Sequence, residues 1–146
     1  FKISEKYNNS IISIRFDGIY MNSTVWINGH LLGSRPNGYV EIRYDLTPYL
    51  HYGEKNNIIE VKVDNSAQPN SRWYTGSGIY RHVWLEFSGK IHFKRWGNQI
   101  TTPEVSEDRA VMVFKTIIIN DDSVSGKLTL QTYLFDPEGK KIIDKE

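Results

Sequence analysis

The sequence contains no cysteine, which excludes disulfides, thiolate nucleophiles and zinc sites built on thiolates. A chain without cysteine fits a reducing and an oxidising compartment equally well, so its location stays open. Apolar runs are also short. The longest purely aliphatic stretch is Ile117–Ile119, far below the roughly 18 residues that a membrane helix needs. We therefore expect no membrane partner.

The basic and acidic residues also nearly balance. Eighteen basic residues stand against seventeen acidic ones, which leaves a net charge of +1 at pH 7. No overall field would draw such a chain to nucleic acid, so we expect no nucleic-acid partner. The histidines lack the close spacing of a metal site, and we predict neither a metal nor a cofactor. These histidines are His30, His51, His82 and His92.

Helical periodicity is absent too, whereas alternation with a period of two runs through most of the chain. Ile12, Ile14 and Phe16 alternate with other residues, as in a strand with one buried face. Asn28-Gly29 separates two apolar stretches and is a strong signal for a tight hairpin, because both residues tolerate positive φ. The sequence therefore predicts an all-β fold. The one helical signal is at Thr47-Pro48, where Thr47 could cap a single turn.

Two further alternating stretches bear on function. Ile59, Val61 and Val63 share one face of a predicted strand. Residues 79–87 alternate as one longer strand, in which Arg81 points to the same side as the apolar residues. Trp26 and Trp84 lie on strands, where we expect them in the core or at a domain interface. Three glutamates fall on outward positions, and we expect them to be solvated and not catalytic. They are Glu41, Glu60 and Glu86.

A second series of strands follows a break near Gly89, which suggests domains at residues 1–88 and 89–146. The predicted strands of the second part are residues 91–93, 110–120, 128–135 and 141–144. An immunoglobulin-like sandwich takes about 100 residues and seven strands, so the second part corresponds to roughly half of one. The chain starts at Phe1 and not at a methionine, so we expect a piece of a longer protein.

The most informative stretch is Arg72–Arg81, which combines three large aromatics, two guanidinium groups and two glycines. It ends a polar segment that starts at Asp64 and is longer than the usual hairpin connection. Planar donors beside aromatic rings suit either a polar, ring-shaped ligand or the surface of another protein. Both alternatives stay open from the residues alone.

A set of motifs distributed in order along residues 11–88 resembles the sugar-binding jelly-roll domain of family 2 glycoside hydrolases. The motifs are Phe16–Met21, Val25–His30, Leu32–Gly33, Gly38–Tyr39, Tyr44–Thr47, Val61–Asn65, Arg72–Tyr74 and Ser77–Leu85. The resemblance implies a jelly-roll, galactose-binding-like β-sandwich followed by a partial immunoglobulin-like β-sandwich. Five consecutive residues resemble the β-galactosidase version of the structural motif in this family. They are Ser77, Gly78, Ile79, Tyr80 and Arg81.

The resemblance also implies a role. In this family, a later (β/α)8 barrel supplies the two glutamates of a retaining mechanism, so we expect no catalytic residue in this chain and no activity of the chain alone. Its partners would be that barrel, as the rest of the parent chain, and a galactoside substrate. The isolated piece would tend to self-associate through the face that the barrel covers, and a homo-oligomer is left open. The compartment would be bacterial, either periplasmic or extracellular, or cytoplasmic.

In the β-galactosidases of this family, a loop just before the structural motif reaches the sugar pocket. The matching candidates for substrate binding are Asn70, Ser71, Arg72 and Trp73. The plainer alternative is that the aromatic residues, Tyr80 among them, pack the loop onto its own sandwich or against the barrel. Two other functions stay open: a free-standing carbohydrate-binding module without catalysis, and an adhesion-type structural sandwich.

Overall fold

The structure, a computed structural model, describes residues 1–67 and 75–145, and its regular elements there are β-strands and two short 3₁₀ turns. The all-β prediction is confirmed. In chain order the elements are η1 (Glu5–Tyr7), β1 (Ile11–Phe16), β2 (Ile19–Tyr20), β3 (Ser23–Ile27), β4 (His30–Arg35), β5 (Ile42–Asp45), η2 (Thr47–Tyr49), β6 (Ile59–Lys62), β7 (Gly78–Ile79), β8 (Val83–Ser88), β9 (Ile91–Val105), β10 (Ala110–Asn120), β11 (Thr132–Phe135) and β12 (Lys141–Lys145). Within the described part, no helix is long and apolar enough to cross a membrane.

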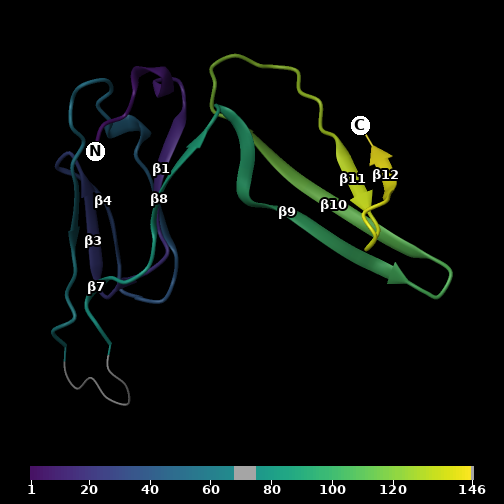
Figure 1. The fold of residues 1–146 in the computed structure, drawn as a ribbon, viewed down its shortest axis with the longest axis horizontal. Helices are drawn as coiled ribbons and strands as arrows, with labels where there is room; N and C mark the ends of the chain where they lie inside the picture. Colours follow the sequence, from purple (N-terminus) through teal and green to yellow (C-terminus); the bar gives the residue numbers. More distant parts are fainter. Residues whose placement is uncertain (68–74, 146) are drawn as a thin grey trace.

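Strands β1 to β8 form a β-sandwich (Figure 1). One sheet has the order β5-β1-β8 and the other β4-β3-β6, while β2 pairs with β7. A single buried cluster draws apolar side chains from both sheets, because the inward positions of each strand repeat every second residue. It consists of Ile14, Phe16, Ile19, Val25, Ile27, Ile42, Tyr44 and Leu46. Ile59, Val61 and Val63, which were predicted to share one face, all pack against this cluster.

The predicted hairpin at Asn28-Gly29 is confirmed. Ile27 pairs with His30 across the turn, and both turn residues have positive φ, 50° at Asn28 and 81° at Gly29. The single helical turn is confirmed as η2, with Pro48 in its first turn. The capping prediction is wrong: Leu46 occupies the N-cap, and it is Asp45 whose carboxylate accepts a 2.9 Å hydrogen bond from the backbone N–H of Thr47.

Asn57 is a buried polar residue that the sequence did not single out. Its side chain is 1% exposed and receives hydrogen bonds from the backbone N–H of His51, at 2.8 Å, and from the amide of Asn28, at 2.9 Å. Its own amide donates to the carbonyl of His51 at 2.7 Å. Asn57 therefore ties the β3–β4 turn to the connection between η2 and β6 with its hydrogen-bonding groups satisfied.

The stretch 79–87, predicted as one strand, is two strands, β7 and β8. His82 lies between these two strands, and its carbonyl accepts a 3.0 Å hydrogen bond from the backbone N–H of Asp17. At this point the chain passes from pairing with β2 to pairing with β1. The change of partner breaks the alternation that the sequence suggested. As a result, Ile79 and Val83 lie in different sheets, although both fit one period-two pattern.

Strands β9 to β12, called here the C-terminal strands, form two antiparallel pairs, β10-β9 and β11-β12. The predicted strand at residues 110–120 is confirmed as β10. Strand β9 is much longer than the predicted residues 91–93, and β11 is shorter than residues 128–135. Among the described residues, the buried apolar side chains all belong to the sandwich. The division at Gly89 into two domains, and the immunoglobulin-like identity of the second, stay predictions.

Candidate functional site

The residues predicted to contact a sugar lie outside the described residues: Asn70, Ser71, Arg72 and Trp73. The structure describes the two flanks of their segment, residues 64–67 and 75–81. The flanks are joined by a 3.1 Å hydrogen bond, which Asn65 Nδ2 donates to Ser77 Oγ. The flanks therefore meet, near the end of the sandwich that carries β7 (Figure 1).

The first flank is held by Asp64. Its backbone N–H donates to the carbonyl of Met21 at 3.1 Å, and its carbonyl accepts a 2.9 Å hydrogen bond from the amide of Asn22. Its carboxylate accepts hydrogen bonds from Ser66, from the hydroxyl at 2.6 Å and from the backbone N–H at 3.1 Å. These bonds lower the pKa of Asp64, because they favour the ionised form. The flank is therefore anchored to the β2–β3 connection.

The second flank contains β7 and, directly after it, Tyr80. Ile79 pairs with Ile19 of β2, which fixes the backbone of the structural motif. The hydroxyl of Tyr80 donates a 2.8 Å hydrogen bond to the carbonyl of Gly38. Its ring lies so close to Gly18 that a Cβ there would be 2.5 Å from it. Tyr80 thus packs onto its own sandwich, as the plainer alternative predicted for this residue.

Arg81, the last residue of the motif, borders a small cavity of about 200 Å³. The other lining residues are Arg15, Asp17, Tyr39 and Glu41. The expectation that Arg81 points to the same side of one strand as the apolar residues is wrong, since residues 79–87 do not form one strand. The reason is the break between β7 and β8, which places Arg81 outside both strands.

Six charged side chains, called here the charge cluster, gather beside the outer face of the β5-β1-β8 sheet: Arg15, Asp17, Glu41, Arg43, Glu86 and Arg95. At its centre the Arg15 guanidinium lies 2.8 Å from Asp17, 3.0 Å from Glu41 and 2.7 Å from Glu86. The hydrogen bond to Glu41 and the three nearby carboxylates raise the pKa of Arg15 above its usual value.

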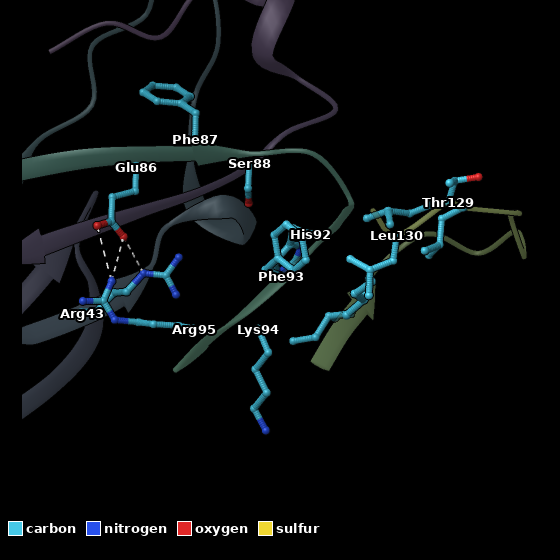
Figure 2. A pocket seen from close by; sticks show the side chains of 14 residues that line it. Arg43, Glu86, Phe87, Ser88, His92, Phe93, Lys94, Arg95, Thr129 and Leu130 are labelled. Atoms are coloured by element: carbon cyan, nitrogen blue, oxygen red, sulfur yellow. Dashed lines mark hydrogen bonds and ion pairs between the residues drawn. The ribbon is translucent and has the colours of Figure 1, made fainter. Parts of the chain in front are cut away.

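Glu86 forms ion pairs with arginines from three strands, β1, β5 and β9. Arg43 Nε lies 2.8 Å from one carboxylate oxygen, and Arg95 Nη1 lies 3.3 Å from the same oxygen (Figure 2). Burial raises the pKa of Glu86, but the hydrogen bond from Arg43 and the charges of Arg43, Arg95 and Arg15 outweigh it, so the pKa lies below its usual value. The expectation that Glu41 and Glu86 are simply solvated is wrong, because both are partly covered and ion-paired.

Trp84 lies beside the charge cluster and not in the core. Its indole N–H donates a 2.9 Å hydrogen bond to Asp17, and the Arg15 guanidinium stands 5.6 Å from its ring centre. Arg15 and Trp84 face each other across the β1–β8 pairing, which explains the contact. Trp26, on β3, is half-buried.

The charge cluster links strands of the sandwich to one another and to β9. A general acid needs a carboxyl group with a raised pKa, whereas Glu86 has a lowered one. Within residues 1–67 and 75–145, no group of three or more His, Asp or Glu side chains is placed to hold a metal ion. The cluster joins strands by charge-assisted hydrogen bonds. The period-two pattern places Arg15 and Arg43 opposite the apolar face of their strands, but it does not indicate that they meet Glu86.

A larger cavity of about 810 Å³ lies where the sandwich meets the C-terminal strands. Arg43 and Glu86 of the charge cluster border it on the sandwich side, and Phe93, Ile118 and Leu130 border it on the other (Figure 2). Its walls are mostly apolar, and Arg43, Glu86 and Arg95 lie together on one side of it (Figure 2). No pattern in the sequence indicated this cavity.

Comparison with known proteins agrees with this architecture. The family Glycosyl hydrolases family 2, sugar binding domain, matches residues 1–88. The β-galactosidase BoGH2A of Bacteroides ovatus is 46% identical over 144 residues, which cover 99% of this chain and 17% of that protein. A putative β-glucuronidase of Formosa agariphila is 44% identical over 112 residues, or 77% of this chain and 11% of that protein.

The likeness extends to solved structures. A glycosyl hydrolase family 2 member from Bacteroides cellulosilyticus superposes with a TM-score of 0.86 and 36% identity, over 99% of this chain and 20% of that one. This chain thus spans at most a fifth of the length of these three relatives. The resemblance inferred from the motifs is confirmed, and the chain belongs to glycoside hydrolase family 2, whose sugar binding domain it contains.

Proposed function

We propose that this chain is a non-catalytic part of a retaining β-galactosidase, in which it supports a catalytic barrel and shapes the rim of the sugar pocket. The observation that carries the proposal is the 46% identity, along 99% of the chain, to a protein named β-galactosidase. The match to a putative β-glucuronidase is slightly lower in identity and covers less of the chain. The substrate would accordingly be a β-galactoside.

The segment between the two flanks would supply the contacts to the sugar. Asn70 carries an amide that can bridge two hydroxyls, Arg72 carries a planar donor pair, and Trp73 offers an apolar face to the C–H side of a pyranose. The structure supports this role through the anchoring of the flanks by Asp64 and Tyr80. Anchored flanks fix where the segment starts and ends, which lowers the entropic cost of orienting a substrate.

The test uses the full-length parent enzyme with nitrophenyl β-galactoside and nitrophenyl β-glucuronide. We expect turnover of the galactoside, and a fall in kcat/KM of roughly tenfold or more for Asn70→Ala or Arg72→Ala, since each removes a hydrogen bond to the sugar. The matched controls are Asn56→Ala and Arg109→Ala, both at exposed positions. Their kcat/KM should stay at the wild-type value, and the melting temperature of every variant should be measured alongside.

Each result has a distinct meaning. Turnover of the glucuronide and not the galactoside would overturn the substrate assignment and leave the supporting role. Unchanged kcat/KM in both loop variants would overturn the role of the segment between the flanks. Binding of galactose by the 146-residue chain alone, measured by calorimetric titration, would favour the free-standing carbohydrate-binding module instead.

A further inference from the structure

Arg95 belongs to β9, yet its guanidinium binds residues of the sandwich. Nη1 lies 3.3 Å from Glu86 of β8, and Nη2 forms an ion pair with Glu41, which precedes β5. All three side chains are about 30% exposed, so the ion pairs are partly shielded from water. Figure 2 shows Arg95 and Arg43 converging on the carboxylate of Glu86. Arg95 is thus the member of the charge cluster that comes from the C-terminal strands.

The backbone of β9 is irregular immediately after Arg95. Trp96 has a φ of 54°, and a Cβ on Gly97 would lie 2.7 Å from the carbonyl oxygen of Lys94. The pairing with β10 shifts register at the same place, between Thr116 and Ile118. Such a bulge bends a strand and re-aims its side chains. Here Arg95 faces the sandwich, while Trp96 is 88% exposed.

Strand pairing does not connect the two parts of the molecule. Among the described residues, β9 to β12 pair only with one another, and the short link Gly89–Lys90 joins β8 to β9. The cavity of about 810 Å³ lies between the two parts and is lined by residues of both. A backbone ladder therefore cannot set the angle between the two parts, and side-chain contacts at the junction must contribute to it.

We propose that Arg95 sets the angle between the sandwich and the C-terminal strands through its ion pairs with Glu41 and Glu86. This set of contacts is called here the latch. The charges suit this role, because the charge cluster holds three guanidinium groups and three carboxylates. Arg95 supplies the third positive charge, which makes the cluster neutral. Without Arg95 the rest of the cluster keeps an excess negative charge and still holds the sandwich strands together through Arg15 and Arg43. The latch can therefore open without unfolding the sandwich. The proposal does not depend on the substrate of the parent enzyme.

The test measures the distance between two spin labels in the 146-residue chain. The absence of native cysteine allows labels at Glu60→Cys in β6 and Lys115→Cys in β10, both exposed positions. We expect a narrow distance distribution in the labelled parent chain. Arg95→Ala should give a distribution of roughly double the width, because the ion pairs no longer restrain the angle. Arg95→Lys, with a single point charge, should give an intermediate width.

The matched control is Arg109→Ala, which removes an exposed ion pair to Glu104 at 2.6 Å within the C-terminal strands. It should leave the distribution unchanged. Salt provides a test without mutation: at about 1 M NaCl the Debye length falls to about 3 Å, and the distribution of the parent chain should broaden. Equal widths for the parent chain and Arg95→Ala would overturn the proposal. So would a parent-chain distribution that is broad at low salt or does not respond to high salt.

Discussion

The hydroxyl of Tyr80 lies 2.8 Å from the carbonyl oxygen of Gly38 and donates a hydrogen bond to it. The backbone N–H of Tyr80 also donates, at 3.3 Å, to the carbonyl of Gly18, against which the tyrosine ring packs. One residue thus joins three loops, those after β1, before β5 and after β7. Because Tyr80 belongs to the second flank of the proposed sugar-binding segment, its packing also positions that flank.

Gly18→Ala should destabilise the sandwich by displacing Tyr80. The added Cβ would lie 2.5 Å from the ring, and overpacking of this kind costs about 1–3 kcal/mol in the free energy of unfolding. Tyr80→Phe, which removes only the hydrogen bond to Gly38, should cost about 0.5–1.5 kcal/mol. Chemical denaturation with urea measures both values.

The control for that displacement is a double-mutant cycle. In a Tyr80→Ala background the ring is gone, so Gly18→Ala should become nearly neutral. A cost that is the same in both backgrounds would mean that the clash with Tyr80 is not its cause.

Asn57→Ala should lower the free energy of unfolding by roughly 2–4 kcal/mol, because it leaves the backbone N–H and carbonyl of His51 and the amide of Asn28 without their buried partner. Asn56→Ala, at the exposed neighbouring position, should change it by less than about 0.5 kcal/mol. Urea denaturation of the two variants gives the comparison. Equal effects at the two positions would rule out the anchoring role of Asn57.

Gly29→Ala tests the tight turn. Gly29 has a φ of 81°, and a Cβ added there would meet nothing within 4 Å, so the whole cost is backbone strain of about 1–2 kcal/mol. Gly29→Asn should cost less, since asparagine tolerates this conformation better than alanine. Thermal melts followed by circular dichroism rank the variants, and an alanine variant as stable as the parent chain would contradict the strain.

Local sequence rules predicted the parts of the fold that depend on neighbouring residues. The alternation of Ile12, Ile14 and Phe16 predicted the buried face of β1, and Asn28-Gly29 predicted the hairpin. In both cases the signal is stereochemical and contained within a few residues, so it does not depend on distant parts of the chain.

The parts that could not be predicted depend on which strands become neighbours. Arg43 and Glu86 meet only because β5 and β8 flank β1, an order that no local pattern contains. Strand β9 was missed beyond residue 93 because the irregularity at Trp96 shifts the phase of the alternation. The break between Ile79 and Val83 was missed for the opposite reason: the alternation continues although the pairing partner changes.

Acid should weaken the sandwich through Glu86. Its pKa is lower in the folded chain than its ordinary value of 4.5, so its contribution to stability is complete above that value and is lost as the pH falls through the folded pKa. Melting temperatures of the parent chain and of Glu86→Gln should therefore differ most near about pH 7 and converge toward about pH 3.

The control is Glu54→Gln, which removes an ion pair to Lys2 in which Glu54 is 96% exposed. Such a pair contributes little at any pH, because water screens it, and its variant should follow the parent chain throughout. A difference between the parent chain and Glu86→Gln that stays constant with pH would show that the ionised carboxylate of Glu86 is not what stabilises the fold.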